Sequence, residues 1–172
     1  RLRRRAGALG LDLDGLIDKG LVEVIHRSPT ELLQDQLAED ILEAVRRRSV
    51  KRLFIDGVDA FKQAAINTNR LGRFFSTLTA ILRSEGVTTV FTAELAEIVG
   101  GDSGLQFPAV SAIAENILLL RYAELESRLY RTLAILKMRE SDFEPYVFEF
   151  TLGEGGFRLG RRMEHTEGVA IG

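Results

Sequence analysis

Cysteine is absent from this 172-residue sequence, and so is any long run of apolar residues. Without cysteine, the chain can have no disulfide scaffold, no thiolate zinc site and no cysteine nucleophile. Its purely aliphatic runs are short, as in Ile117–Leu120, whereas a membrane-spanning helix needs about 20 apolar residues. The basic start, Arg1–Arg5, leads into no apolar stretch of the kind that marks a signal peptide. We therefore expect a soluble, cytoplasmic protein.

A surplus of either charge is also lacking. The sequence has 23 Lys and Arg against 25 Asp and Glu, which gives a formal net charge of -2. A protein that binds duplex DNA through its phosphates needs a surplus of cations, so we expect no nucleic-acid partner. Hydrophobic residues make up 45% and charged residues 28% of the chain, which is typical of a folded globular domain.

A phosphate-binding P-loop is also absent. That motif requires Gly-x-x-x-x-Gly-Lys followed by Ser or Thr, because its backbone N–H groups and its lysine surround the phosphates. The Gly100–Gly104 cluster contains no lysine, and no other segment matches the motif. The sequence by itself therefore contains no conventional cradle for a nucleoside triphosphate.

Helices and strands alternate through the first two thirds of the chain. Apolar residues at helical spacing predict helices, and β-branched or aliphatic runs predict strands, of which the run Leu53–Asp56 is of the buried type. The expected helices are Leu2–Leu9, Asp12–Lys19, a helix that begins at the capping box Ser28–Glu31 and ends at Arg48, and Arg70–Arg83; the expected strands are Leu21–His26, Leu53–Asp56 and Val87–Thr92. Strands that alternate with helices run parallel and are joined by crossovers, which predicts an α/β fold.

The last third changes character, because strand-like segments follow one another with only short connections. These segments are Asn116–Glu124, Leu129–Arg139 and Tyr146–Leu152, and the glycine cluster Gly153–Gly156 is typical of a turn. We expect them to form an antiparallel meander attached to the edge of the parallel sheet. Residues 161–172 are expected to form a linker or the start of a following segment.

Two polar residues follow neighbouring strands of the expected parallel sheet. Ligands of such sheets bind at the carboxyl ends of the strands, where Asp56 and Thr92 both lie. Asp56 could hold Mg²⁺, directly or through water, beside a bound nucleotide; the alternative is an aspartate that simply begins a turn. The Thr92 hydroxyl could contact a phosphate or an attacking water, and the alternative is a cap for the following segment.

A pair of cations ends one of the later strands. Lys137 and Arg139 are two residues apart, so on a strand both side chains project to the same face. We expect them on an edge element, where two cations suit a phosphate group bound by a neighbouring molecule, as an arginine finger does. The alternative is a charged edge strand that discourages aggregation.

Taken together, these segments resemble the KaiC family of RecA-like ATPases from about Arg4 to Leu159. The most specific part of the resemblance runs from Glu115–Tyr122 through Arg131–Arg139. Leu53–Asp56 and Val87–Glu94 lie at the right distances before it. The co-occurrence of these segments is what makes the resemblance specific.

The resemblance implies a RecA-like P-loop NTPase fold, with a mostly parallel sheet flanked by helices and a C-terminal antiparallel meander. Residues 1–160 would be the C-terminal portion of one ATPase domain, whose P-loop and paired catalytic glutamates lie upstream. The implied cofactors are ATP and Mg²⁺. Asp56 matches the Walker B aspartate, which organises Mg²⁺, and Thr92 matches the polar strand-end residue near the γ-phosphate. Lys137 and Arg139 match the Lys-x-Arg pair that reaches the nucleotide of the next subunit in a hexameric ring.

The sequence departs from the family's pattern at three places. Gly57 follows the Walker B aspartate where the family usually has serine, and Glu140 follows Arg139 where the family usually has glycine. Where the clock protein's second domain has a phosphorylated Ser-Thr pair, this chain has Ser111 and Ala112. Ser111 is therefore the one candidate phosphoacceptor, and a clock-type cycle with two acceptors is not expected.

The resulting functional prediction is a part of an ATP-binding and ATP-hydrolysing signalling protein that forms a homo-oligomeric ring, with autokinase activity as a further expectation. Its protein partners in signalling are not identified by the sequence. The chain alone is expected to be inactive. The alternatives are a RadA-like recombination and repair ATPase and a non-catalytic module that uses a RecA fold for protein interaction.

Overall fold

The computed structural model describes residues 1–26, 34–58, 61, 71–94, 113–163 and 170–171. The chain divides into two compact units. The first, which we call the helix-covered unit, consists of His26–Ala96 and Gly104–Ala114. The second, which we call the antiparallel-sheet unit, consists of Arg1–Ile25, Glu97–Ser103 and Glu115–Gly172. Together they contain helices, a parallel sheet and an antiparallel sheet, so the predicted α/β class is confirmed.

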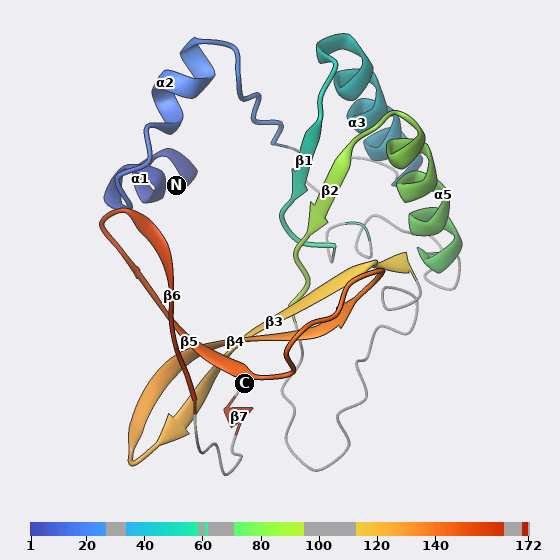
Figure 1. Ribbon diagram of the computed structural model, residues 1–172. Coiled ribbons are helices and arrows are strands. Elements are labelled where there is room, and N and C mark those ends of the chain that lie inside the picture. The colour runs from blue at the N-terminus through green and yellow to red at the C-terminus, as the bar shows by residue number, and fades with distance from the viewer. Residues whose placement is uncertain (27–33, 59–60, 62–70, 95–112, 164–169, 172) are drawn as a thin grey trace. The chain divides into compact units, whose positions relative to one another are not determined.

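In the residues that the structure describes, the helix-covered unit contains two helices and two parallel strands. Its elements are α3 (Gln34–Arg48), β1 (Arg52–Ile55), α5 (Leu71–Ser84) and β2 (Thr88–Phe91). The two strands pair in parallel, from Arg52 opposite Thr88 to Ile55 opposite Phe91, so they end level with each other. Both helices lie on the same face of this pair of strands (Figure 1).

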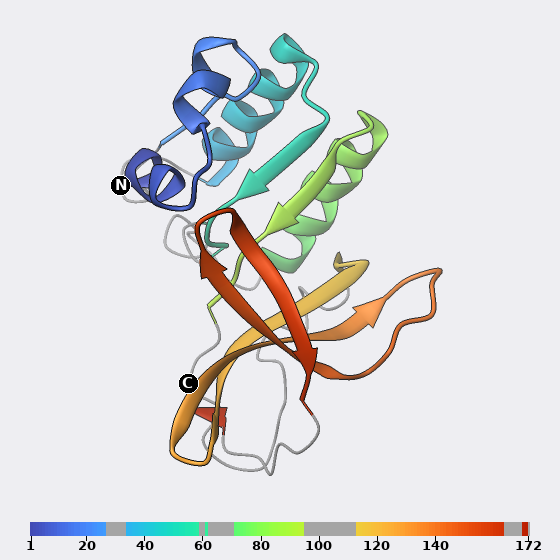
Figure 2. The same cartoon turned by 60° about the vertical axis from the view of Figure 1, so that its left-hand side comes forward.

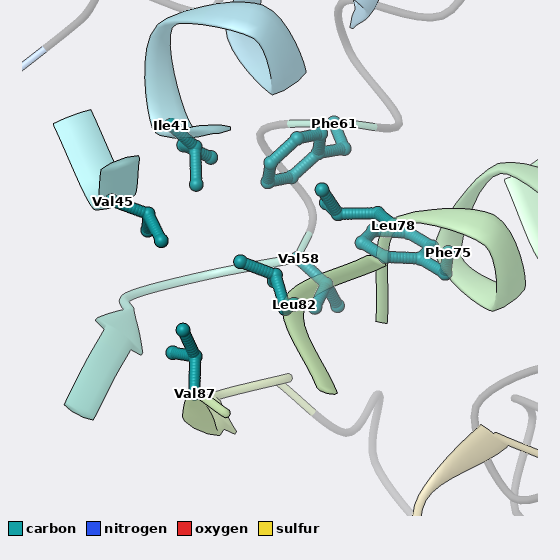
Figure 3. Close-up of a cluster of buried hydrophobic side chains, with 8 residues drawn as sticks. All are labelled: Ile41, Val45, Val58, Phe61, Phe75, Leu78, Leu82 and Val87. Atoms are coloured by element: carbon teal, nitrogen blue, oxygen red, sulfur yellow. The ribbon is translucent and has the colours of Figure 1, made fainter. Parts of the chain in front are cut away.

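A hydrophobic core fills the space between these helices and strands. Its buried side chains, which point toward one another in Figure 3, are Ile41, Val45, Val58, Phe61, Phe75, Leu78, Leu82 and Val87. From β1, Leu53 and Ile55 pack against this cluster, whereas Phe54 between them is 62% exposed. The expectation that this strand is buried on both faces is therefore wrong for Phe54, because the helices cover only one face of the strand pair.

The described part of the antiparallel-sheet unit contains two short helices and a five-stranded sheet. Its elements are α1 (Leu2–Ala8), α2 (Leu13–Asp18), β3 (Asn116–Leu125), β4 (Arg128–Met138), β5 (Val147–Gly153), β6 (Gly156–Arg162) and β7 (Ala170–Ile171). The strand order is β6-β5-β4-β3-β7, and every neighbouring pair is antiparallel. Figure 2 shows the β3–β4 and β5–β6 hairpins as two long ribbons.

The two short helices agree with their sequence signals. The Asp12 side chain accepts a hydrogen bond from the Gly15 N–H (2.9 Å) and so caps α2. Gly10 and Gly20 follow α1 and α2 with φ of 71° and 69°, the left-handed conformation that the predicted helix ends require. None of the helices in the described part of the chain has the length and apolar character needed to cross a bilayer.

Two expectations about strands are wrong. Residues 21–26 are irregular, with Leu21 exposed, because β-branched composition favours a strand only where a neighbouring strand pairs with it. The meander belongs to a sheet of its own, since the ladders of the described residues join β1 only to β2. Beyond the expected segments, the structure has a further strand, β6, which extends from Gly156 to Arg162. The capping box Ser28–Glu31 lies outside the described residues. The helix that it was expected to begin, α3, ends at Arg48 as predicted.

Candidate functional site

Asp56 and Thr92 lie side by side at the carboxyl ends of β1 and β2. Because Ile55 is opposite Phe91 in the parallel register, the next residue of each strand reaches the same edge of the sheet. There the Thr92 hydroxyl donates a hydrogen bond to Asp56 Oδ1 (2.8 Å). The structure thus brings together the two strand-end residues that the sequence singled out for this edge.

Thr92 is tied to the end of β1 and to the segment after it by three further hydrogen bonds. Its backbone N–H donates to the Ile55 carbonyl (3.0 Å), and its own carbonyl accepts from the Val58 N–H (2.9 Å). Its hydroxyl oxygen accepts from the Gly57 N–H (2.7 Å). Gly57 makes this possible in a left-handed conformation, with φ of 91°, which a residue with a Cβ rarely adopts.

The Asp56 carboxylate has the properties of a magnesium ligand. The side chain is exposed, Oδ1 is held by Thr92, and Oδ2 has no hydrogen-bond or ion-pair partner within the described part of the chain. The described residues contain no group of three or more His, Cys, Asp or Glu side chains suited to a metal. Mg²⁺ is commonly held by one or two carboxylates together with water and phosphate oxygens, so a single aspartate fits Mg²⁺ beside a nucleotide.

Lys137 and Arg139 lie at the end of β4. The expectation of an edge element is wrong for the strand as a whole, because β4 lies between β3 and β5. The β4–β5 register extends only from Thr132 to Ala134, however, so among the described residues the last part of β4 pairs with β3 alone. Lys137 is half-buried, and Arg139, just past the strand, is exposed.

The backbone of Arg139 is anchored to the start of β3. Its N–H donates to the Glu115 carbonyl (3.1 Å) and to Asn116 Oδ1 (3.3 Å). A register shift between Ile117 and Leu118 precedes this anchor. The Asn116 contact was not expected from the sequence, because only the strand register reveals that this side chain lies opposite the end of β4.

The candidate residues fall into two groups that belong to different units. Asp56 and Thr92 lie in the helix-covered unit, and Lys137 and Arg139 lie in the antiparallel-sheet unit. Ser111 and the Gly100–Gly104 cluster lie outside the described residues.

The chain is similar to known proteins over nearly its whole length. A family model described as "ATPase: KaiC" matches residues 1–164. The circadian clock protein KaiC3 of Synechocystis is 26% identical over 175 positions, which cover 100% of this chain and 34% of that protein. The circadian clock oscillator protein KaiC of Prochlorococcus marinus is 32% identical over 168 positions, which cover 91% of this chain and 33% of that protein. The chain therefore spans about a third of the length of these curated relatives.

A solved structure extends the agreement to the fold. The crystal structure of a KaiC-like protein from the hyperthermophilic archaeon Pyrococcus horikoshii aligns with a TM-score of 0.76 and 22% sequence identity. The alignment covers 93% of this chain and 69% of that one. The predicted RecA-like fold is thereby confirmed.

Proposed function

Because the chain belongs to the KaiC ATPase family, we propose that Asp56 and Thr92 form the metal side of an ATP-hydrolysing site. The observation that carries this proposal is the hydrogen bond from the Thr92 hydroxyl to Asp56 at the carboxyl edge of two level parallel strands. Ligands of open α/β sheets bind at this edge. The sequence contains no phosphate-cradling P-loop, so the proposal gives this chain only the metal side of the site.

Each residue then has a defined task at this edge. Bound Mg²⁺ would offset the charge of the phosphates. Asp56 would hold the metal through Oδ2, directly or through water, while Oδ1 is hydrogen-bonded to Thr92. The level ends of β1 and β2 fix the separation between the two residues, because neighbouring strands are hydrogen-bonded along their length.

For Lys137 and Arg139 we propose action on the nucleotide of a neighbouring subunit in a homo-oligomeric, hexameric ring. Support comes from the family and from the position of the pair at the exposed end of β4, where Arg139 extends past the strand. Two cations suit the charge that develops on a transferring phosphoryl group. Glu140, the next residue, has a φ of 59°, so the backbone leaves the direction of β4 directly after Arg139.

The biological setting is also a proposal. The relatives carry names that refer to the circadian clock, and we propose for this chain a place in a cytoplasmic signalling ATPase. Autokinase activity would use Ser111 as its acceptor, since Ala112 has no hydroxyl.

The metal-site proposal is tested with Asp56→Asn in the full-length protein. The substitution is nearly isosteric but removes the carboxylate charge, so we expect the fold to be kept and ATP hydrolysis to fall by about 10²-fold. The matched control is Asp18→Asn, which changes an exposed aspartate at the end of α2 and should leave hydrolysis unchanged. Turnover of the Asp56 variant within about twofold of the wild type, at saturating Mg²⁺, would count against the proposal.

A further inference from the structure

The Thr92 hydroxyl both donates and accepts a hydrogen bond in this structure. We propose that Thr92 is a positioning residue, which acts through Asp56 and does not itself donate a hydrogen bond to the γ-phosphate. This inference rests on the proposed function, because it concerns how the metal side of the ATP site is held in place. It differs from the role that the family resemblance suggested for Thr92.

The argument begins with the number of hydrogen bonds that a hydroxyl can make. A threonine hydroxyl has one proton to donate and two lone pairs that accept. Its proton is used on Asp56 Oδ1 (2.8 Å), and one lone pair is used by the Gly57 N–H (2.7 Å). Phosphate oxygens are acceptors, so binding one would require the proton that Asp56 already receives.

The bond to Asp56 is the stronger choice for that proton. Hydrogen bonds to an ionised acceptor are shorter and stronger than those between neutral groups. The Gly57 N–H also polarises the hydroxyl in the direction of the carboxylate, since chains of hydrogen bonds reinforce one another. Backbone bonds to Ile55 and Val58 fix the main chain of Thr92, and its β-branched side chain has few rotamers.

The consequence for Asp56 is a fixed orientation. With Oδ1 held by Thr92, the carboxylate can rotate little, and Oδ2 is the oxygen left to face a metal or its water. Groups that hold a metal ligand in this way commonly change metal affinity by about 10- to 100-fold when removed. Thr92 should therefore affect metal binding more than phosphate binding.

Thr89 provides a matched control on the same strand. Its hydroxyl is buried, and it has no hydrogen-bond partner within the described residues. Thr89→Val and Thr92→Val each remove one hydroxyl from the β2 segment while keeping a β-branched side chain. Only the second removes a hydroxyl that touches Asp56.

The experiment measures Mn²⁺ binding by electron paramagnetic resonance, with the full-length protein and a non-hydrolysable ATP analogue. We expect Thr92→Val to weaken Mn²⁺ binding by about 10-fold, and Thr92→Ser and Thr89→Val to stay within about twofold of the wild type. In the Asp56→Asn background, Thr92→Val should bring no further loss of Mn²⁺ binding, because the carboxylate that Thr92 orients toward the metal has been removed. The preference for the ATP analogue over ADP in EDTA should not change in Thr92→Val.

Other results would overturn the inference. A Thr92→Val protein that binds Mn²⁺ normally, or that loses its metal-free preference for the ATP analogue over ADP, would show that Asp56 is not the target of Thr92. If the valine side chain disturbs the fold, Thr92→Ala serves in its place, because it removes the same hydroxyl and leaves a smaller side chain. The same loss of Mn²⁺ binding is expected for it. A wild-type protein that binds no Mn²⁺ with the nucleotide would contradict the proposed function as well, whereas the results above overturn the positioning role alone.

Discussion

The two units of this chain bury their apolar residues to very different extents. The helix-covered unit contains the whole eight-residue core cluster, between α3, α5 and the β1–β2 pair. In the antiparallel-sheet unit, the buried hydrophobic residues are Ala6, Ala123 and Phe150, counted within the described residues. Leu118, Leu120 and Tyr122 alternate along β3 and are all exposed. The comparison shows that helices packed on a pair of strands bury a hydrophobic core within one unit. The antiparallel sheet is held together by the hydrogen bonds between its strands and buries few apolar residues.

The cause lies in the pattern of each element. The apolar residues of α5 recur at helical spacing and therefore form one stripe that faces β1 and β2. Along β3, apolar residues occur at successive positions, and successive side chains of a strand point to opposite faces. One face of such a strand is left apolar and exposed.

The largest expected difference between the units is in the cost of removing a leucine side chain. Leu82 is 0% exposed in the core, so Leu82→Ala should reduce the opening free energy of β2 by about 2–5 kcal/mol. Leu120 is 57% exposed, so Leu120→Ala should change that of β3 by about 0.5 kcal/mol or less. Hydrogen exchange of the full-length protein, read in peptides that cover each strand, measures both.

Equal costs for the two variants would break this comparison. If Leu120→Ala increased exchange of β3 as strongly as Leu82→Ala does for β2, the exposed face of the sheet would have to be covered in the full-length protein. If Leu82→Ala had little effect, the core cluster would not be the source of stability in its unit.

A smaller effect is expected from backbone conformation at two glycines, one in each unit. A Cβ at Gly57 or at Gly153 would meet no other atom within 4 Å, but only Gly57 has a positive φ, of 91°. Gly57→Ala should therefore destabilise the end of β1 by about 1–2 kcal/mol through left-handed strain. Gly153→Ala lacks that strain and should be close to neutral. The same hydrogen-exchange measurement compares the two variants. Equal losses of stability in both would show that the positive φ of Gly57 is not the cause.

Much of the helix-covered unit could be predicted from the sequence. The stripes of α3 and α5, the glycines at helix ends, the apolar run of β1 and the β-branched run of β2 are local signals, and each predicted element exists where it is described. The exposure of Phe54 could not be predicted, because an apolar run does not tell which of its faces is covered.

The antiparallel sheet was predicted less completely for a physical reason. After Gly156, every residue of β6 is exposed, and its apolar alternation is limited to Phe157 and Leu159, which is too short a signal to define the strand. It is defined instead by its ladder to β5, which is a contact between segments. The edge position expected for Lys137 and Arg139 was wrong for a different reason, since β4 is the middle strand of the expected three-strand meander and pairs with both β3 and β5.

At the candidate site, too, local signals in the sequence were sufficient for some features, and contacts between segments decided the others. The strand-end rule was sufficient to place Asp56 and Thr92 at one edge. It could not predict that the Thr92 proton goes to Asp56, or that Gly57 donates to Thr92, because these depend on side-chain rotamers and on a positive φ.

The central proposal is that Asp56 of one subunit and Arg139 of its neighbour supply different parts of one kind of site. It is tested most directly by mixing full-length Asp56→Asn protein with full-length Arg139→Ala protein. Each variant alone should be nearly inactive in ATP hydrolysis, since loss of an arginine that acts in trans can cost about 10³-fold or more. After subunit exchange in an equal mixture, about a quarter of the interfaces should pair an intact Asp56 with an intact Arg139, and activity should return in part. Full activity of the Arg139→Ala protein, or no recovery although fluorescence energy transfer proves exchange, would contradict the claim.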